Sequence, residues 1–342
     1  MTPSDMPLRF YPGTPLTILN ADGKTTFDMD KFFTDQRAVG LLIISDNKVR
    51  LEKYGKDYGP SGRWTSFSMA KSFTSTLVGA AIKDGYIKSV DEPVTDIIPE
   101  FKGTAYDGVT IKQILTMSSG VRWNEDYADP NSDVGQFDHV KTVPGEEAIV
   151  TYLKKLPRAH PPGTVWHYNT GETGLIGVIV MRATHKPLAQ YLSEKIWSHT
   201  MAMPGFWVLD TTGHEIGGCC ISASLADYAR FGQFIMDGAK VNGQSIVPDG
   251  WIAAATSKQK DIDHPGRGYG YQWWSYDDGS FSAVGHFGQT IFVDPKRKLV
   301  IAMNADFPSN DEHVPMEARF AFERLVQQAV DREDGVTRPL MQ

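Results

Sequence analysis

The 342-residue sequence has little cysteine, no long hydrophobic run and no excess of positive charge. No apolar stretch approaches the roughly 20 residues that span a bilayer, so a membrane segment is not expected. The formal charge of −7 argues against nucleic acid or anionic membranes as partners, because both select clustered Lys and Arg. The start, MTPSDMPLRF, lacks a basic segment followed by an apolar run, so no signal peptide is expected. With that start taken as native, the predicted location is cytoplasmic.

The only cysteines are the adjacent pair Cys219 and Cys220. Neighbouring Cα atoms lie about 3.8 Å apart, which is shorter than unstrained disulfides prefer, so a bond between the two sulfurs is not expected. No CxxC motif or histidine ladder surrounds the pair. The sequence therefore predicts two buried, inert thiols. No metal site and no cofactor is implied anywhere in the chain.

Strand-like segments lie near both ends of the chain, with helical segments between them. Residues 38–45 and 48–54 flank Asp46-Asn47 and predict a hairpin. Later strands are predicted at 269–276, 281–287, 290–294 and 299–304, and helices at 110–118, 172–184, 187–198, 223–237 and 311–332. This order predicts an α/β fold in the α+β sense, with one antiparallel sheet built from both termini. Residues 1–85 and 220–342 would form the sheet domain, 86–219 an inserted, mainly helical domain, and the active site would lie in the cleft between them.

A Ser-x-x-Lys spacing is the first feature that points to chemistry, because a helix brings residues three apart onto one face. A serine hydroxyl is a weak nucleophile until a base removes its proton, and a buried lysine amine can be that base. The spacing occurs at Ser45/Lys48, Ser68/Lys71 and Ser257/Lys260. The first spans the predicted turn, and the third lies in the polar segment SKQKD, where a solvated lysine keeps its charge. Only the second opens an apolar helix, which is predicted to end at Asp84-Gly85.

Two interpretations of Ser68 stay open on the residues alone. In one, Ser68 caps its own helix and Lys71 is a surface charge. In the other, the pair is a nucleophile and its base. The apolar run LVGAAI that follows favours the second, because a free surface position would be more polar. The absence of a G-x-S-x-G motif argues against an α/β-hydrolase.

The stretch SMAKSFTSTLVGAAIKDG resembles the first motif of the penicillin-recognising serine hydrolases, the superfamily of β-lactamases, DD-peptidases and family VIII esterases. Over residues 38–335, the stretches AYDGVTIKQIL, NEDYADP, DTTG, YQWW and GQTIFVDP resemble the 6-aminohexanoate-dimer hydrolases and their esterase relatives. The resemblance implies a β-lactamase/DD-peptidase-like antiparallel sheet flanked by helices, with an inserted helical domain. It also implies an acyl-enzyme on Ser68 and a small ester or amide substrate, and it leaves a homodimer possible.

The second motif of this superfamily is a tyrosine or serine that passes a proton to the leaving group. Tyr168-Asn169-Thr170 fills its place, where Thr170 keeps a hydroxyl but lacks the amide of Tyr-x-Asn. The resemblance therefore implies that Tyr168 is catalytic and that Thr170 lies in the substrate site. The alternative is that Tyr168 is only a wall aromatic beside Trp166.

The third motif supplies half of the oxyanion hole, and two registers fit it. His286-Phe287-Gly288 matches by letters and would make the amide of Gln289 the donor. Counting back from Asp294-Pro295 instead puts Gly285 in the glycine position and makes His286 the donor. We favour the second register, because strand alternation fixes the pairing. In both registers the Ser68 N–H is the other donor.

The substrate class is inferred from the family's substrate-binding residues that this sequence has and from those that it lacks. The third motif has no lysine to bind a penicillin carboxylate, so β-lactamase activity would be weak. Tyr127, in NEDYADP, matches a tyrosine that closes over the substrate and assists amide cleavage. Trp166, Trp273 and Trp274 are candidates for an apolar substrate wall, with sheet and core packing as the alternative. A D-amino-acid peptidase and an inactive ligand-binding scaffold remain alternatives to a small-acyl esterase or amidase.

Overall fold

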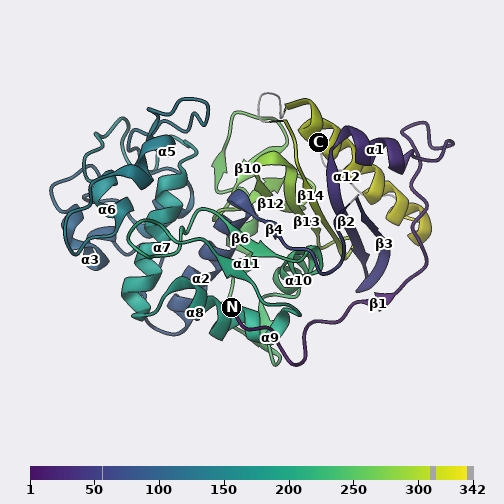
Figure 1. The fold of residues 1–342 in the computed structure, drawn as a ribbon, viewed down its shortest axis with the longest axis horizontal. Helices are drawn as coiled ribbons and strands as arrows, with labels where there is room; N and C mark the ends of the chain where they lie inside the picture. The colour runs from purple at the N-terminus through teal and green to yellow at the C-terminus, as the bar shows by residue number, and fades with distance from the viewer. Residues whose placement is uncertain (56, 309–312, 337–342) are drawn as a thin grey trace.

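A nine-stranded sheet crosses the computed structural model, which describes residues 1–55, 57–308 and 313–336 (Figure 1). Its order is β1-β3-β2-β14-β13-β12-β11-β10-β9. The bounds are β1 Tyr11–Pro12, β2 Ala38–Ser45, β3 Lys48–Tyr54, β9 Lys260–Asp261, β10 Arg267–Tyr269, β11 Trp274–Tyr276, β12 Phe281–Gly285, β13 Gln289–Asp294 and β14 Leu299–Ala305. The N-terminal hairpin pairs with the last strand through an antiparallel β2–β14 ladder. The predicted antiparallel sheet built from both termini is confirmed.

Both faces of the central strands are buried, which explains the continuous apolar run in β2. Leu41 and Ile43 face one side, where α1 (Met29–Asp35) and α12 (His313–Asp334) pack. Leu42 and Ile44 face the other side, where α2 (Ala70–Lys83) and α10 (Leu225–Met236) pack. Successive side chains of a strand point to opposite faces, so a strand covered on both sides is apolar throughout. The predicted sheet flanked by helices is confirmed, and Figure 1 shows α12 and α10 on opposite faces.

The helices between the two strand groups gather to one side of the sheet (Figure 1). They are α3 Val94–Ile97, α4 Ile111–Leu115, α5 Asp133–Gln136, α6 Ala148–Leu153, α7 Thr170–Thr184, α8 Leu188–Leu192 and α9 Ser198–Thr200, and α11 Trp251–Thr256 follows α10. The short strands β4 (Trp64–Thr65), β6 (Ile221–Ala223) and β5 (Phe206–Trp207) form a second sheet, and β7 (Lys240–Val241) pairs with β8 (Gln244–Ser245). One hydrophobic cluster runs from these helices into the large sheet. The two-domain division therefore stays a prediction.

Three predicted elements differ from the structure. The strand predicted over 269–276 is two strands, β10 and β11, because Gln272 adopts a positive φ of 63° and its amide donates to the Leu115 carbonyl of α4 at 2.8 Å. The strand predicted over 281–287 ends at Gly285, where the chain turns through residues 286–288. The helix predicted over 187–198 is interrupted by a π-helical turn at Ser193–Trp197. The helix predicted from 311 is described from His313 onward, and residues 311 and 312 lie outside the described part of the chain.

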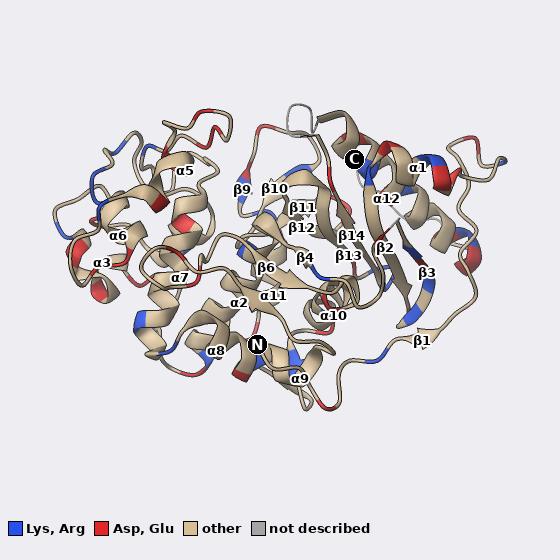
Figure 2. Cartoon of the chain, viewed as in Figure 1, with Lys and Arg blue, Asp and Glu red and all other residues tan. Residues whose placement is uncertain are grey.

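Charged residues of both signs are spread over the outer elements of the molecule, with blue and red segments close together on α1 and β3 (Figure 2). Among the described residues, no helix combines the length and the apolar character that crossing a lipid bilayer requires. The long C-terminal helix α12 instead packs its apolar side chains on the sheet.

A buried ion cluster joins the turn between β13 and β14 to α12. Arg297, 3% exposed, donates to Asp294 Oδ2 at 2.6 Å and to Asp331 Oδ2 at 2.8 Å. Gln327 donates to Asp294 Oδ2 and to Asp278 Oδ2, both at 2.8 Å. The cluster links the turn between β13 and β14 to α12 through buried contacts that solvent does not screen.

We expect Arg297→Ala to lower the free energy of unfolding by about 3–5 kcal/mol, because it leaves a buried carboxylate without its cation. Urea denaturation followed by circular dichroism measures the change. The matched control is Lys298→Ala, which removes the neighbouring cation from an exposed pair with Asp46 and should leave the urea midpoint close to that of the wild type. Equal effects of the two substitutions would contradict a structural role for the buried cluster.

Candidate active site

Ser68 lies in a single 3-10 turn, Phe67–Met69, that leads directly into α2. The small sheet fixes this turn, because Ser66 N donates to the Ile221 carbonyl of β6 at 2.7 Å and Ser66 Oγ accepts from Ile221 N at 3.0 Å. Phe67 has a φ of 44°, a left-handed conformation that is costly for a residue with a side chain. The turn holds Ser68 partly exposed at the N-terminal end of a buried helix.

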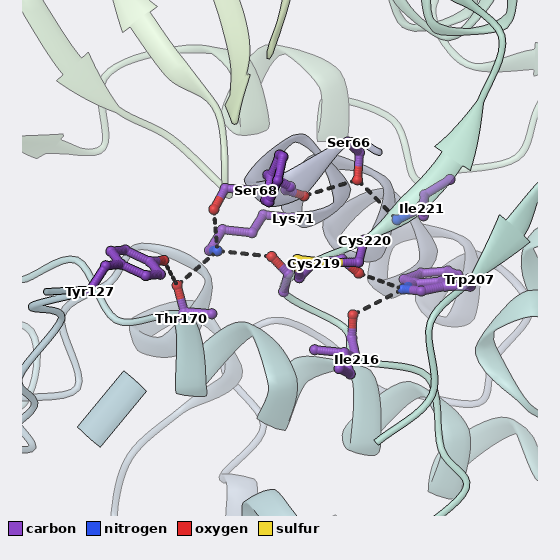
Figure 3. The surroundings of a disulfide bond; sticks show 12 residues. Ser66, Ser68, Lys71, Tyr127, Thr170, Trp207, Ile216, Cys219, Cys220 and Ile221 are labelled. Carbon is purple, nitrogen blue, oxygen red and sulfur yellow. Dashed lines mark hydrogen bonds between the residues drawn. A yellow bond between two sulfur atoms is a disulfide. The ribbon is translucent and has the colours of Figure 1, made fainter. Parts of the chain in front are cut away.

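Lys71 lies one helical turn after Ser68 and is only 2% exposed. Its Nζ is 2.9 Å from Ser68 Oγ, 3.0 Å from Thr170 Oγ1 and 2.9 Å from the Gly218 carbonyl oxygen (Figure 3). Burial lowers the pKa of Lys71 to about 8, and the negative charge of Glu125 acts in the opposite direction. A large share of the amine is therefore neutral near pH 8, unlike that of a solvated lysine. The surface-charge interpretation of Lys71 is wrong.

Tyr168 lies next to this amine, just before α7. Lys71 Nζ is 5.1 Å from the centre of the Tyr168 ring, and Trp274 stacks on the ring at 5.9 Å. Burial raises the pKa of Tyr168 well above its ordinary value of about 10, with smaller contributions from Tyr269, Tyr127 and Glu125. The phenol is therefore protonated at neutral pH and is available as a proton donor.

Glu125 belongs to the site but was not predicted from the sequence, although NEDYADP contains it. Its Oε2 accepts from Thr170 N at 2.9 Å and from the Trp123 indole N–H. Its Oε1 accepts from the Tyr127 hydroxyl at 2.7 Å and from the Thr170 hydroxyl. The available signal was a carboxylate two residues before a tyrosine already assigned to the substrate site. The loop over residues 123–127 is thereby tied to the start of α7.

The end of β12 lies beside Ser68, as the third motif requires. Gly285 approaches so closely that a Cβ on it would lie 2.3 Å from the Ser66 carbonyl oxygen, so only glycine fits there. Gly285 pairs with Gln289 across the hairpin, and His286 begins the turn between them. Gln289 is fully buried, and its side chain donates to the Ala305 carbonyl oxygen at 2.7 Å. These positions support the register with Gly285 as the motif glycine over the register that uses Gln289.

Two hollows meet at Ser68, Tyr127 and His286, which line both. The larger has a volume of about 630 Å³ and is mostly apolar, with Val134, Phe137, Ile216 and Phe287 among its walls. The smaller, about 130 Å³, extends past Tyr168 and Trp274 to Met316 and Arg319 of α12. A bound molecule can therefore place one part on each side of the Ser68 hydroxyl.

The three predicted wall tryptophans lie in different environments. Trp274 lines the smaller hollow. Trp166 packs behind it, with ring centres 5.9 Å apart, and lines neither hollow. Trp273 is 1% exposed and packs between Phe231 and Phe281 in the core, so the packing alternative describes it. Sequence alternation along YQWW could not separate them, because the chain turns at Gln272.

Cys219 and Cys220 form a disulfide, so the prediction of two free, buried thiols is wrong. Cys220 has a φ of 75°, a backbone conformation that the Cα separation rule did not consider. Both residues are partly exposed and line the larger hollow, and Trp207 Nε1 donates to the Cys219 carbonyl oxygen at 2.9 Å (Figure 3). Disulfides persist mainly in oxidising compartments, so this pair gives no support to a cytoplasmic location.

Arg319 was also missed, although it lies on the apolar side of the predicted C-terminal helix. It is 1% exposed, and its Nε and Nη2 have no hydrogen-bond partner among the described residues. Glu323 Oε1 lies 3.7 Å from Arg319 Nε, and burial raises the pKa of Glu323 to about 7. Arg319 therefore lines the smaller hollow with an incomplete counter-charge. A buried Arg on an apolar helix stripe was the signal.

The site thus contains a hydroxyl and a buried amine at hydrogen-bond distance, a phenol ring beside the amine, and two hollows that meet at the hydroxyl. A family model described as Beta-lactamase matches residues 29–325. The 6-aminohexanoate-dimer hydrolase of Paenarthrobacter ureafaciens is 28% identical over 316 residues, which cover 88% of this chain and 80% of that protein.

Two solved structures share the fold. A Bacillus anthracis protein, whose name proposes 6-aminohexanoate-dimer hydrolase activity, has a TM-score of 0.83 and 23% identity over 98% of this chain and 91% of that one. EstCE1, described as a hydrolase with promiscuous acyltransferase activity, has a TM-score of 0.68 and 15% identity over 88% of this chain and 96% of that one. Since the family model covers most of the sequence, this chain belongs to the beta-lactamase family of hydrolases.

Proposed function

We propose that this protein hydrolyses small carboxylic esters or amides through an acyl-enzyme on Ser68. The observation that carries the proposal is the buried Lys71 amine, 2.9 Å from Ser68 Oγ, with a pKa lowered to about 8. A neutral amine at this distance can take the hydroxyl proton as Oγ attacks the substrate carbonyl carbon. The Oγ–C bond then forms and the bond from that carbon to the leaving oxygen or nitrogen breaks.

The leaving group needs a proton, and Tyr168 is the proposed donor. Its raised pKa keeps the phenol protonated, and the proton that Lys71 has taken from Ser68 can restore it. Water then attacks the acyl carbon and releases the carboxylic acid, which returns Ser68 to its hydroxyl form. The N–H groups of Ser68 and His286 are the proposed oxyanion donors, and the close approach of Gly285 to Ser66 supports this assignment.

Tyr127 supports amide as well as ester substrates. Its hydroxyl proton goes to Glu125, so its oxygen keeps lone pairs that can accept the N–H of a bound amide. Its ring stacks on His286 at 4.9 Å and lines both hollows beside Ser68. The Paenarthrobacter relative, whose name describes cleavage of an amide-linked dimer, supports the same extension. A D-amino-acid peptidase or weak β-lactamase is the alternative substrate class, and an inactive scaffold is the alternative outside enzymes.

The smaller hollow favours substrates with an acidic group. Arg319, which is 1% exposed, lines this hollow, and Val284, Phe307 and Met316 are among the other lining residues. A carboxylate entering this space would satisfy the donors that lack partners, and guanidinium–carboxylate pairs are strong when they are desolvated. Because Tyr168 lines the same hollow, the acidic group would be carried by the leaving group. The 6-aminohexanoate named for the Paenarthrobacter relative is itself a carboxylate.

The direct test is covalent labelling of Ser68. A fluorophosphonate should add its mass to the peptide that contains Ser68, as mass spectrometry reads. Ser68→Ala should remove the label and nearly all turnover of p-nitrophenyl acetate while the far-UV circular dichroism stays unchanged. Lys71→Arg should lower turnover at least about 10²-fold, because a guanidinium does not act as a base near neutral pH. Labelling of Ser45 or Ser257 instead would overturn the proposal, and a fold without any reactive serine would favour the scaffold.

We expect Tyr127→Phe to separate amides from esters. The variant loses the oxygen that would accept the amide N–H, whereas an ester has no such hydrogen. Amide hydrolysis should fall about tenfold or more, and p-nitrophenyl acetate turnover should change less than about threefold, the size of one weak contact. Steady-state kinetics on both substrates measures the split. Equal losses would show that Tyr127 only shapes the hollows.

We expect Arg319→Met to raise KM about tenfold or more for a substrate whose leaving group ends in a carboxylate. KM for the matched methyl-capped substrate should change less than about threefold, because that substrate presents no charge to Arg319. The control is Arg267→Met, which removes a second arginine that packs on Phe320 but does not line the hollow. If both variants affect both substrates alike, the hollow does not recognise an acid.

A further inference from the structure

Neutral Lys71 must point its one lone pair at Ser68 if it is to take the proton. A neutral amine has two hydrogens and one lone pair, and Lys71 has three neighbours at hydrogen-bond distance. The Gly218 carbonyl oxygen can only accept, so it always takes one amine hydrogen. The Thr170 hydroxyl can either donate or accept. If Thr170 accepts an amine hydrogen, the lone pair of Lys71 faces Ser68. If Thr170 donates its own hydrogen to the amine, the lone pair faces Thr170.

Glu125 determines the direction of the hydrogen bond between Thr170 and Lys71. The single hydroxyl hydrogen of Thr170 is donated to Glu125 Oε1, which leaves only lone pairs on the side of Lys71. The Tyr127 hydroxyl donates its own hydrogen to the same carboxylate oxygen. It therefore has no hydrogen left to donate to Thr170. With Gly218 and Thr170 both acting as acceptors, the two amine hydrogens are fixed and the lone pair is left for Ser68 Oγ.

We propose that Glu125 is a positioning residue that acts through Thr170 to aim the Lys71 lone pair at the Ser68 hydroxyl. The inference rests on the proposed acyl-enzyme function. A Tyr-x-Asn motif would not need this role, because the oxygen of an asparagine amide in the place of Thr170 accepts a hydrogen bond without a partner to orient it. Glu125 is well held for this role. Its Oε2 receives two N–H groups, from Thr170 and from the Trp123 indole, so the carboxylate has one orientation.

The same arrangement specifies what Glu125→Gln would do. The two N–H donors at the Oε2 position require an acceptor, so the oxygen of the new amide would take that place. Its NH₂ would then face Thr170 Oγ1 and donate to it. Thr170 would be free to turn its hydrogen toward Lys71, and the lone pair would be drawn away from Ser68. The substitution is close in size but reverses the direction of this hydrogen bond.

Several titratable or charged groups lie in the site that contains Lys71. They are Glu125 and Tyr127 from the loop, Tyr168 before α7, Tyr269 of β10, His286 after β12, and Arg319 of α12. Glu125 raises the pKa of Lys71 against the effect of burial. Removing its charge should therefore lower that pKa, so the neutral base would persist to lower pH. This shift follows from the charge of Glu125 alone, so the positioning role is tested by the plateau rate and by its recovery in Thr170→Ser.

The experiment measures the rate of Ser68 labelling by a fluorophosphonate between about pH 6 and 9, which requires no knowledge of the substrate. Glu125→Gln and Thr170→Val should each lower the plateau rate about ten- to a hundredfold. Thr170→Ser, which keeps the hydroxyl, should restore the rate to within about threefold of the wild type. The acidic limb of the pH–rate profile of Glu125→Gln should lie at lower pH than that of the wild type, because an opposite charge near the amine is gone.

The control is Asp126→Asn, which removes an exposed carboxylate next to Glu125 that bonds only to the loop amide of Ala128 among the described contacts. It should label like the wild type. The double variant Glu125→Gln/Thr170→Val should be about as slow as the slower single variant, because both changes break one pathway. Multiplied losses in the double variant, or a Thr170→Ser rate as low as that of Thr170→Val, would overturn the inference.

Two further outcomes are distinguished by the same measurement. Thermal melting shows whether Glu125→Gln folds. If it does not fold, the labelling rates of Thr170→Val and Thr170→Ser test the inference instead, and equal rates for these two variants would overturn it. If the wild type shows no labelling at Ser68, the proposed function fails. If the wild type is labelled and Glu125→Gln behaves like Asp126→Asn, only the positioning role fails.

Discussion

The burial of one lysine amine is the constraint on which the rest of the site depends. Withdrawing Lys71 from water lowers its pKa to about 8, and every polar group around it must then compensate for the lost hydration. Gly218 and Thr170 do so with acceptors, and Glu125 holds Thr170 in place. Each of these comes from a different segment of the chain. The site can therefore form only after α2, α7 and the loops at 125 and 218 have packed together.

The sheet explains why those segments meet where they do. Its central strands are covered on both faces and leave no open surface for a substrate. The site instead lies where the last turn of β12, the start of α2 and the helical segments come together, with α12 reaching the smaller hollow. Gly285 and Gly218 allow this approach, because a Cβ on Gly285 would collide with Ser66 and one on Gly218 would lie 3.0 Å from Thr170.

The sequence predicted the elements whose signal is local. The hairpin of β2 and β3, the apolar helix after Ser68 and the strand at Leu299–Ala305 follow from alternation and turn residues. The Ser68–Lys71 contact follows from helical spacing, and the placing of Tyr168 beside it from the resemblance. Glu125 and Arg319 were not predicted, because their roles depend on partners distant in sequence. The burial of Trp273 and the interruption at Gln272 depend on a hydrogen bond to α4. The bond between Cys219 and Cys220 is accompanied by a positive φ. Neither feature appears in the periodicity of the sequence.

The turn at Phe67–Met69 places Ser68 two residues before Ala70, the first residue of the 14-residue helix α2. The peptide dipoles of such a helix add up to roughly half a positive charge at this end. In the proposed reaction, that field acts on both partners. It disfavours an extra proton on Lys71 before the attack, and it favours negative charge on the carbonyl oxygen afterwards. One helix terminus therefore favours both the neutral form of the proposed base and the developing anion of the proposed reaction.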